Sequence, residues 1–364
     1  MRTIATILAL FIAGPAAAQI SPPQQPARGP GGYEAPHAAV NARSFGEGAT
    51  SYWVFTPGEP APARAPVIVF MHGWGGMNPN HYAAWIEHIV RRGAIVVYPA
   101  YQEGFRSKPA GVLDDALEGI KSATGRIRRG EFGVEGDFDR FAIVGHSAGG
   151  LLALNIAAVA TREGLPQPKA LMSVSPGMTK GREGRTLVPT EAWEKIPRGT
   201  LLLSLAGEDD KFVGDADALR VYRRTTQIPP DDKDYVVLRS DAHGTPPLNA
   251  AHFAATTGGH LPGVPQEDAK TREERKGGPL RRRLQKRTLK KLEAQDAGDF
   301  NAQERRTVDA LDYYGTWKLF DALTDAAFYG ENRDVALGGG EKQRYMGAWS
   351  DGAPVKELLV SDPE

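Results

Sequence analysis

Short apolar runs rich in β-branched residues alternate with helical segments along most of this chain. Few folds fit that alternation, because strands separated by helices form a mostly parallel sheet with helices on both faces. The sequence therefore predicts an α/β fold. The expected buried strands are Val67–Met71, Ala94–Pro99, Phe141–Val144, Ala170–Val174, Thr200–Ala206 and Tyr235–Leu238, and Ser51–Thr56 is expected at an edge.

The helical segments begin and end at recognisable residues. Asn78 can cap a helix that has Pro79 at its first position, and Gly93 ends it. Between them, apolar residues recur at the spacing of one buried helical face, at Tyr82, Trp85, Ile86, Ile89 and Val90. We expect further helices at Leu113–Ile127, Leu151–Thr161 and Ala216–Thr226, and a late helix containing Tyr313, Trp317 and Phe320.

The two ends of the chain differ from this central part. Arg2, the apolar run over residues 4–13 and the small residues 16–18 fit a signal peptide cleaved after Ala18, which predicts a secreted or periplasmic protein. Residues 19–37 are rich in Pro, Gln and Gly and predict a flexible tether. We assign residues 38–335 to the folded domain and 336–364 to a C-terminal tail.

Charge and cysteine content exclude several classes of protein. The chain has 44 Lys and Arg against 44 Asp and Glu, which argues against a nucleic-acid partner for the chain as a whole. It has no Cys, which excludes disulfides, thiolate metal sites and a Cys nucleophile. Covalent catalysis must therefore use another side chain.

A Gly-x-Ser-x-Gly motif lies between a predicted strand and a predicted helix. The motif is Gly145-His146-Ser147-Ala148-Gly149, and it follows the strand at Phe141–Val144 directly. A serine in a sharp turn between strand and helix needs neighbours without side chains, so that its backbone can adopt unusual dihedrals and its hydroxyl can stand clear of the sheet. Ser147 is therefore the candidate nucleophile.

With this motif in its strand-turn-helix setting, the sequence resembles the α/β-hydrolase superfamily, over most of residues 51–244 and the late helix. The resemblance implies a central sheet with helices on both faces and a catalytic acid and histidine that follow the nucleophile in that order. It implies Asp210 as the acid, three residues after Gly207, with Asp209 as the competitor.

The base is expected on a short loop after the last strand. His243 follows Tyr235–Leu238 closely and is our choice, ahead of His252 and His260, which lie in a less strand-like stretch after Pro246.

An oxyanion hole completes the site that the resemblance implies. The strand at Val67–Met71 ends in His72-Gly73-Trp74-Gly75-Gly76, and the backbone N–H groups of Trp74 and Ala148 are the expected donors, with His72 structural. This chemistry needs no metal and no cofactor, and the sequence contains no convincing metal-ligand cluster.

Two other regions bear on the substrate and on partners. Only about two dozen residues separate Ser175 from Arg198, which predicts a small cap or none. Within a basic insertion at about residues 265–305, Lys270–Lys291 holds eleven basic and two acidic residues; we expect a solvated insertion, with weak contact to an anionic surface as the alternative.

These features together predict an exported serine hydrolase that acts on carboxylic esters through Ser147, Asp210 and His243. The alternatives are a serine peptidase of prolyl-oligopeptidase type, because Gly150 follows the motif, and a catalytically silent binding protein on the same fold.

Overall fold

The computed structural model describes residues 19–104, 107–177, 188–266 and 307–363. The predicted signal peptide, the basic segment Lys270–Lys291 and residues 178–187 of the region expected to hold a cap lie outside these ranges. The small cap therefore stays a prediction.

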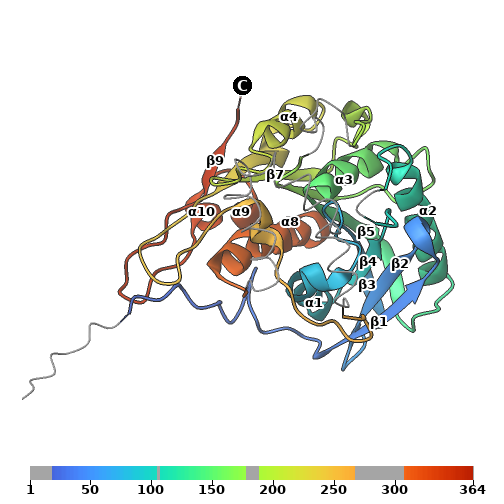
Figure 1. Cartoon of the computed structure of the whole chain (residues 1–364), viewed down its shortest axis with the longest axis horizontal. Helices are drawn as coiled ribbons and strands as arrows, with labels where there is room; N and C mark the ends of the chain where they lie inside the picture. Colours follow the sequence, from blue (N-terminus) through green and yellow to red (C-terminus); the bar gives the residue numbers. More distant parts are fainter. Residues whose placement is uncertain (1–18, 105–106, 178–187, 267–306, 364) are drawn as a thin grey trace, which may run out of the picture.

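A single sheet of nine strands forms the centre of the described chain (Figure 1). Its order is β1-β2-β4-β3-β5-β6-β7-β8-β9, and the strands from β4 to β8 run parallel. The strands are β1 (Ala39–Phe45), β2 (Tyr52–Gly58), β3 (Arg64–Met71), β4 (Ile95–Pro99), β5 (Glu135–His146), β6 (Ala170–Val174), β7 (Leu201–Gly207), β8 (Lys233–Leu238) and β9 (Leu359–Ser361). The predicted α/β-hydrolase fold is confirmed.

Helices cover both faces of this sheet. They are α1 (Ala83–Arg91), α2 (Val112–Arg128), α3 (Ala148–Val159), α4 (Ala216–Arg224), α8 (Trp317–Tyr329), α9 (Arg333–Ala336) and α10 (Glu341–Arg344), with a π-helical turn at Leu311–Thr316 before α8. The predicted cap at Asn78 is present, because its side chain accepts a hydrogen bond from the Asn80 N–H at 2.9 Å.

Alternation along β3 shows how the two faces are built. Val67, Val69 and Met71 point to the face covered by α2 and α3, whereas Ile68 and Phe70 point to the face covered by α1 and α8 (Figure 1). All five side chains are buried, as a central strand of a sheet covered on both sides requires.

The expected edge strand lies inside the sheet. β2 pairs with β4 on one side and with β1 on the other, so β1 and β9 are the edges of the described sheet. The expectation was wrong because β1, at Ala39–Phe45, carries Asn, Arg and Ser and has little of the apolar character used to find strands.

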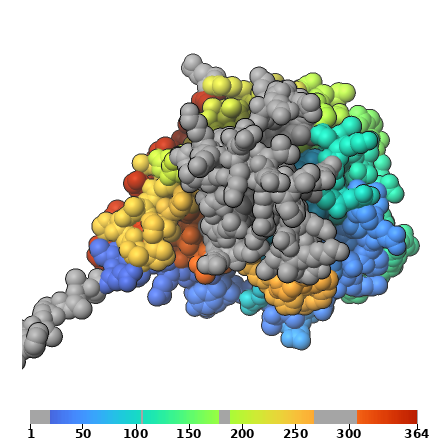
Figure 2. All heavy atoms as spheres, viewed as in Figure 1, coloured from blue at the N-terminus to red at the C-terminus, as the bar shows by residue number. Residues whose placement is uncertain are grey.

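The segment predicted to be a flexible tether is packed onto the folded body. Pro23 is buried and accepts a hydrogen bond from the Tyr313 hydroxyl, and the Gly31 N–H donates to Asp321 Oδ2 at 2.7 Å. Figure 2 shows the first described residues beside residues that follow β8, where the Thr245 N–H donates to the Ile20 carbonyl at 2.8 Å. A segment with few apolar side chains is held here by its backbone groups, which composition does not reveal.

The predicted C-terminal tail is also part of the domain. Trp349 is buried, with its indole N–H 3.2 Å from Asp241 Oδ2, and β9 pairs antiparallel with β8.

Among the described helices, none is both long enough and apolar enough to cross a membrane.

Candidate active site

Ser147 occupies the sharp turn between β5 and α3. Its φ of 57° and ψ of −124° lie where residues with a side chain are rarely found. The neighbouring glycines are required sterically, since a Cβ on Gly145 would lie 2.2 Å from the Gly149 carbonyl oxygen and one on Gly149 would lie 2.3 Å from the His72 carbonyl oxygen. The turn therefore holds Ser147 in a strained, fixed position at the carboxyl end of the sheet.

The imidazole of His252 lies between Ser147 and Asp210. Its Nε2 is 2.9 Å from Ser147 Oγ, and its Nδ1 is 2.8 Å from Asp210 Oδ2. Because a carboxylate only accepts, Nδ1 carries a proton, and in the neutral ring Nε2 is then free to accept the serine proton. All three side chains are buried. This is the arrangement that activates a serine for nucleophilic attack.

Asp210 is fixed as an ionised acceptor. Its Oδ1 accepts hydrogen bonds from the backbone N–H groups of Phe212 and Val213, each at 3.0 Å. Burial, the largest single influence, opposes ionisation, but the hydrogen bond and charge of His252 and these two N–H donors together lower the pKa of Asp210 below its ordinary value. The structure thus places Asp210, and not Asp209, against the imidazole.

His243 does not reach this site, and the expectation that it would contact Ser147 is corrected. Its Nε2 lies 2.8 Å from Asp351 Oδ2, and its side chain is 40 % exposed. The reason is an excursion of the chain after β8, closed by an antiparallel bridge between Asp241 and Leu248. His243 lies on that excursion, away from the nucleophile.

The chain returns to the site only after Leu248. The Asp209 N–H donates to the Ala250 carbonyl at 3.1 Å, so the stretch that leads to His252 lies against the loop that carries Asp210. Leu248, Ala250 and Ala255, which flank His252 in the sequence, are buried, and His252 begins a short 3₁₀ helix. Their apolar character was the one sequence signal that could have favoured His252 over His243.

The loop after β3 is held rigidly beside Ser147. The Gly73 N–H donates to the Tyr82 hydroxyl and the Gly75 N–H donates to Gln102 Oε1, each at 2.9 Å. The Tyr98 hydroxyl donates to the Gly76 carbonyl. Because the N–H groups of Gly73 and Gly75 are both hydrogen-bonded, the backbone of Trp74, which lies between them, is held in one orientation.

The predicted oxyanion donors lie at the two expected places. Trp74 lies between those two glycines, and Ala148 is the first residue of α3, where N–H groups have no acceptor within the helix. A Cβ built on Gly73 would lie 3.3 Å from Ser147 Cβ, which shows how closely the loop approaches the nucleophile. The donor roles of Trp74 and Ala148 stay predictions.

His72 is buried at the base of the same loop. Its Nδ1 and Nε2 each lie 2.7 Å from a carbonyl oxygen, of Gly73 and Ala100, and its ring stacks on Tyr101 with centroids 4.2 Å apart. Burial, opposed by the two backbone hydrogen bonds, lowers the pKa of His72 to about 4. In the neutral ring that burial favours, only one of the two nitrogens carries a proton, so only one of these two contacts is then a hydrogen bond.

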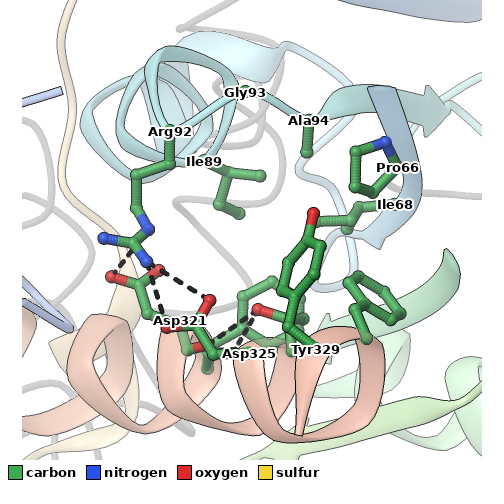
Figure 3. Close-up of a pocket in the computed structure, with 12 residues that line it drawn as sticks. Pro66, Ile68, Ile89, Arg92, Gly93, Ala94, Asp321, Asp325 and Tyr329 are labelled. Atoms are coloured by element: carbon green, nitrogen blue, oxygen red, sulfur yellow. Dashed lines mark hydrogen bonds and ion pairs between the residues drawn. The ribbon is translucent and has the colours of Figure 1, made fainter. Parts of the chain in front are cut away.

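A hollow lies away from the triad, between α1, the first half of β3 and α8 (Figure 3). Ser147 follows β5, which is parallel to β3, so the hollow is displaced toward the opposite end of the sheet. Its charged groups are paired with one another, because Arg92 Nε is 3.3 Å from Asp321 Oδ2 and Arg92 Nη2 is 3.3 Å from Asp325 Oδ2. These ion pairs connect the C-terminal end of α1 to α8.

Among the described residues, no group of three or more His, Cys, Asp or Glu side chains is placed to hold a metal ion.

Two comparisons with known proteins bear on this site. Residues 68–224 match a family model described as alpha/beta hydrolase fold. A stretch of 122 residues is 34 % identical to Esterase LipI of Mycobacterium tuberculosis (strain ATCC 25618 / H37Rv), and it covers 33 % of this chain and 36 % of that protein. The chain thus matches about a third of the length of this curated relative.

Proposed function

Because the chain belongs to the α/β-hydrolase superfamily, we propose that it is a serine hydrolase that cleaves carboxylic esters through Ser147, His252 and Asp210. The observation that carries the proposal is the position of one imidazole, 2.9 Å from the serine oxygen and 2.8 Å from the carboxylate. The similarity to a protein named as an esterase supports the choice of esters.

The mechanism follows from the positions of the protons. His252 Nε2 takes the proton of Ser147 as its oxygen attacks the ester carbonyl carbon, and Asp210 stabilises the imidazolium that forms. The N–H groups of Trp74 and Ala148 hold the resulting oxyanion. The imidazolium then gives its proton to the departing alcohol, which leaves an acyl group on Ser147. Water, activated by His252 in the same way, releases the acid.

A fluorophosphonate probe tests this mechanism directly. The wild-type chain should be labelled covalently, and Ser147→Ala should not. Labelling at another residue would remove Ser147 from the role of nucleophile, and no labelling of the folded wild-type chain would favour the catalytically silent binding protein. Esters run beside matched amides distinguish esterase from peptidase, because the peptidase alternative requires the amides to be cleaved at a comparable rate.

Export is a separate proposal. It is supported by the apolar run and by the small residues that end at Ala18. N-terminal sequencing of the protein recovered from its native host should begin at Gln19, and a chain that retains Met1 would contradict cleavage.

A further inference from the structure

His146 precedes the nucleophile in sequence, yet its ring is directed at other partners. Its Nε2 lies 2.8 Å from the backbone carbonyl oxygen of His252, and its Nδ1 lies 2.9 Å from the Tyr82 hydroxyl. Only 1 % of His146 and 2 % of Tyr82 are exposed. The triad described above uses neither side chain.

The direction of each hydrogen bond follows from chemistry. A carbonyl oxygen only accepts, so His146 Nε2 must carry a proton, and in the neutral ring Nδ1 then accepts from the Tyr82 hydroxyl. The Tyr82 oxygen in turn accepts from the Gly73 N–H at 2.9 Å. The bonds therefore form one directed chain from Gly73 through Tyr82 and His146 to the backbone of His252.

Packing holds this chain in place. The Tyr82 ring lies against Phe70, with centroids 5.0 Å apart, and the His146 ring lies 4.9 Å from the His252 ring. Burial raises the pKa of the Tyr82 phenol above its ordinary value, so the hydroxyl is protonated at neutral pH and can donate.

We propose that Tyr82 and His146 are positioning residues that couple the oxyanion loop to the general base, so that both are held at the distances catalysis needs. The proposal rests on the function proposed above. Gly73 is joined directly to Trp74, a predicted oxyanion donor, and the His252 carbonyl belongs to the same residue as the catalytic imidazole. A change in any link of the chain therefore moves both groups relative to Ser147.

Kinetics of three variants test the coupling. Tyr82→Phe removes the hydroxyl and breaks two links, and His146→Ala removes the ring. We expect each to lower kcat by about 10- to 100-fold, because reacting groups misplaced by a fraction of an ångström lose rate of this order. KM should change by less than about twofold, since neither side chain is a substrate contact in this account. The double variant should be no slower than the slower single variant, because both act through one chain.

Two further variants serve as controls. Tyr52→Phe makes the same chemical change at a tyrosine that is also 2 % exposed, whose hydroxyl bonds Ser122 Oγ at 2.8 Å, and it should keep kcat near the wild-type value. His146→Gln restores a donor near the position of Nε2 and should recover part of the rate lost in His146→Ala. The proposal is overturned if a folded Tyr82→Phe protein has wild-type kcat, or if the two single losses multiply in the double variant.

A spectroscopic measurement separates this proposal from the proposed function. With ¹⁵N-labelled histidine, His146, assigned by comparison with His146→Gln, should show a protonated Nε2 and an unprotonated Nδ1, and the Nδ1 resonance should shift in Tyr82→Phe. The opposite tautomer would overturn the chain of hydrogen bonds even in an enzyme that hydrolyses esters. Failure of probe labelling would instead overturn the hydrolase assignment, and the tautomer is measured whether or not labelling occurs.

Discussion

The ring of Phe212 packs against the imidazole of His252, with centroids 4.8 Å apart. Phe212 is 38 % exposed, although its own backbone N–H is bound to Asp210 Oδ1. A partly exposed aromatic ring thus lies beside the imidazole that we propose as the general base.

Phe212→Ala should weaken the positioning of His252 without removing any hydrogen bond of the triad. An aromatic contact of this kind stabilises by about 1 kcal/mol, which corresponds to a loss of about fivefold in kcat. Phe212→Tyr keeps the ring and is the matched control. Steady-state kinetics on a soluble ester measure both, and an equal loss in the two variants would show that the contact with His252 is not the cause.

His252→Ala should lose activity as severely as Ser147→Ala, by about 10⁶-fold, because the members of a triad act as a unit. His243→Ala makes the same substitution on the exposed excursion and should keep near-normal turnover. The comparison needs only kcat for one ester in the three variants. Severe loss in His243→Ala with turnover retained in His252→Ala would reverse the assignment.

Asp210→Asn should lower kcat by about 10⁴-fold, because an amide in place of the carboxylate favours the wrong tautomer of His252. Asp209→Asn is the neighbouring control, and its kcat should stay within a few-fold of wild type. Rate measurements on both variants decide between them. A larger loss at Asp209 would mean that the functional loop differs from the one described here.

His72 should make stability depend on pH. In the folded protein its pKa is lowered from 6.5 to about 4, so between these values the unfolded chain binds more protons. The stabilisation is therefore complete above pH 6.5 and is lost as the pH falls toward 4, by about 3 kcal/mol in total. Urea unfolding at a series of pH values measures it.

His72→Asn should flatten that pH dependence. An NMR titration gives an independent reading. An imidazole of His72 that titrates near pH 6.5 in the folded protein would contradict the argument from burial.

Most of the sheet and the sharp turn at Ser147 could be predicted because their signals are local. The strand at Ala170–Val174 is apolar along its whole length and ends as predicted, and the turn at Ser147 requires the glycines that the sequence displays. The position of Asp210 could be predicted because its loop directly follows the buried strand β7. A residue only three positions after the end of that strand must lie near the same edge of the sheet.

The histidine that lies beside Ser147 could not be chosen by the same reasoning. The bridge from Asp241 to Leu248 is a contact between segments, and it adds an excursion between β8 and the site that nearness in sequence does not reveal. The packing of residues 19–36 was missed for a related reason, since backbone carbonyls such as those of Ile20 and Pro23 carry much of it.

The packed N-terminal segment has a consequence for the order of folding. Its partners are Thr245, Tyr313, Asp321 and Ser350, which the ribosome makes long after residue 19. The segment at residues 19–36 is synthesised first but can pack only after residues 245–350 have been synthesised. Contacts between segments so far apart in sequence are slow to form. A recombinant chain that starts at residue 38 would leave the Tyr313 hydroxyl and Asp321 Oδ2 without these partners.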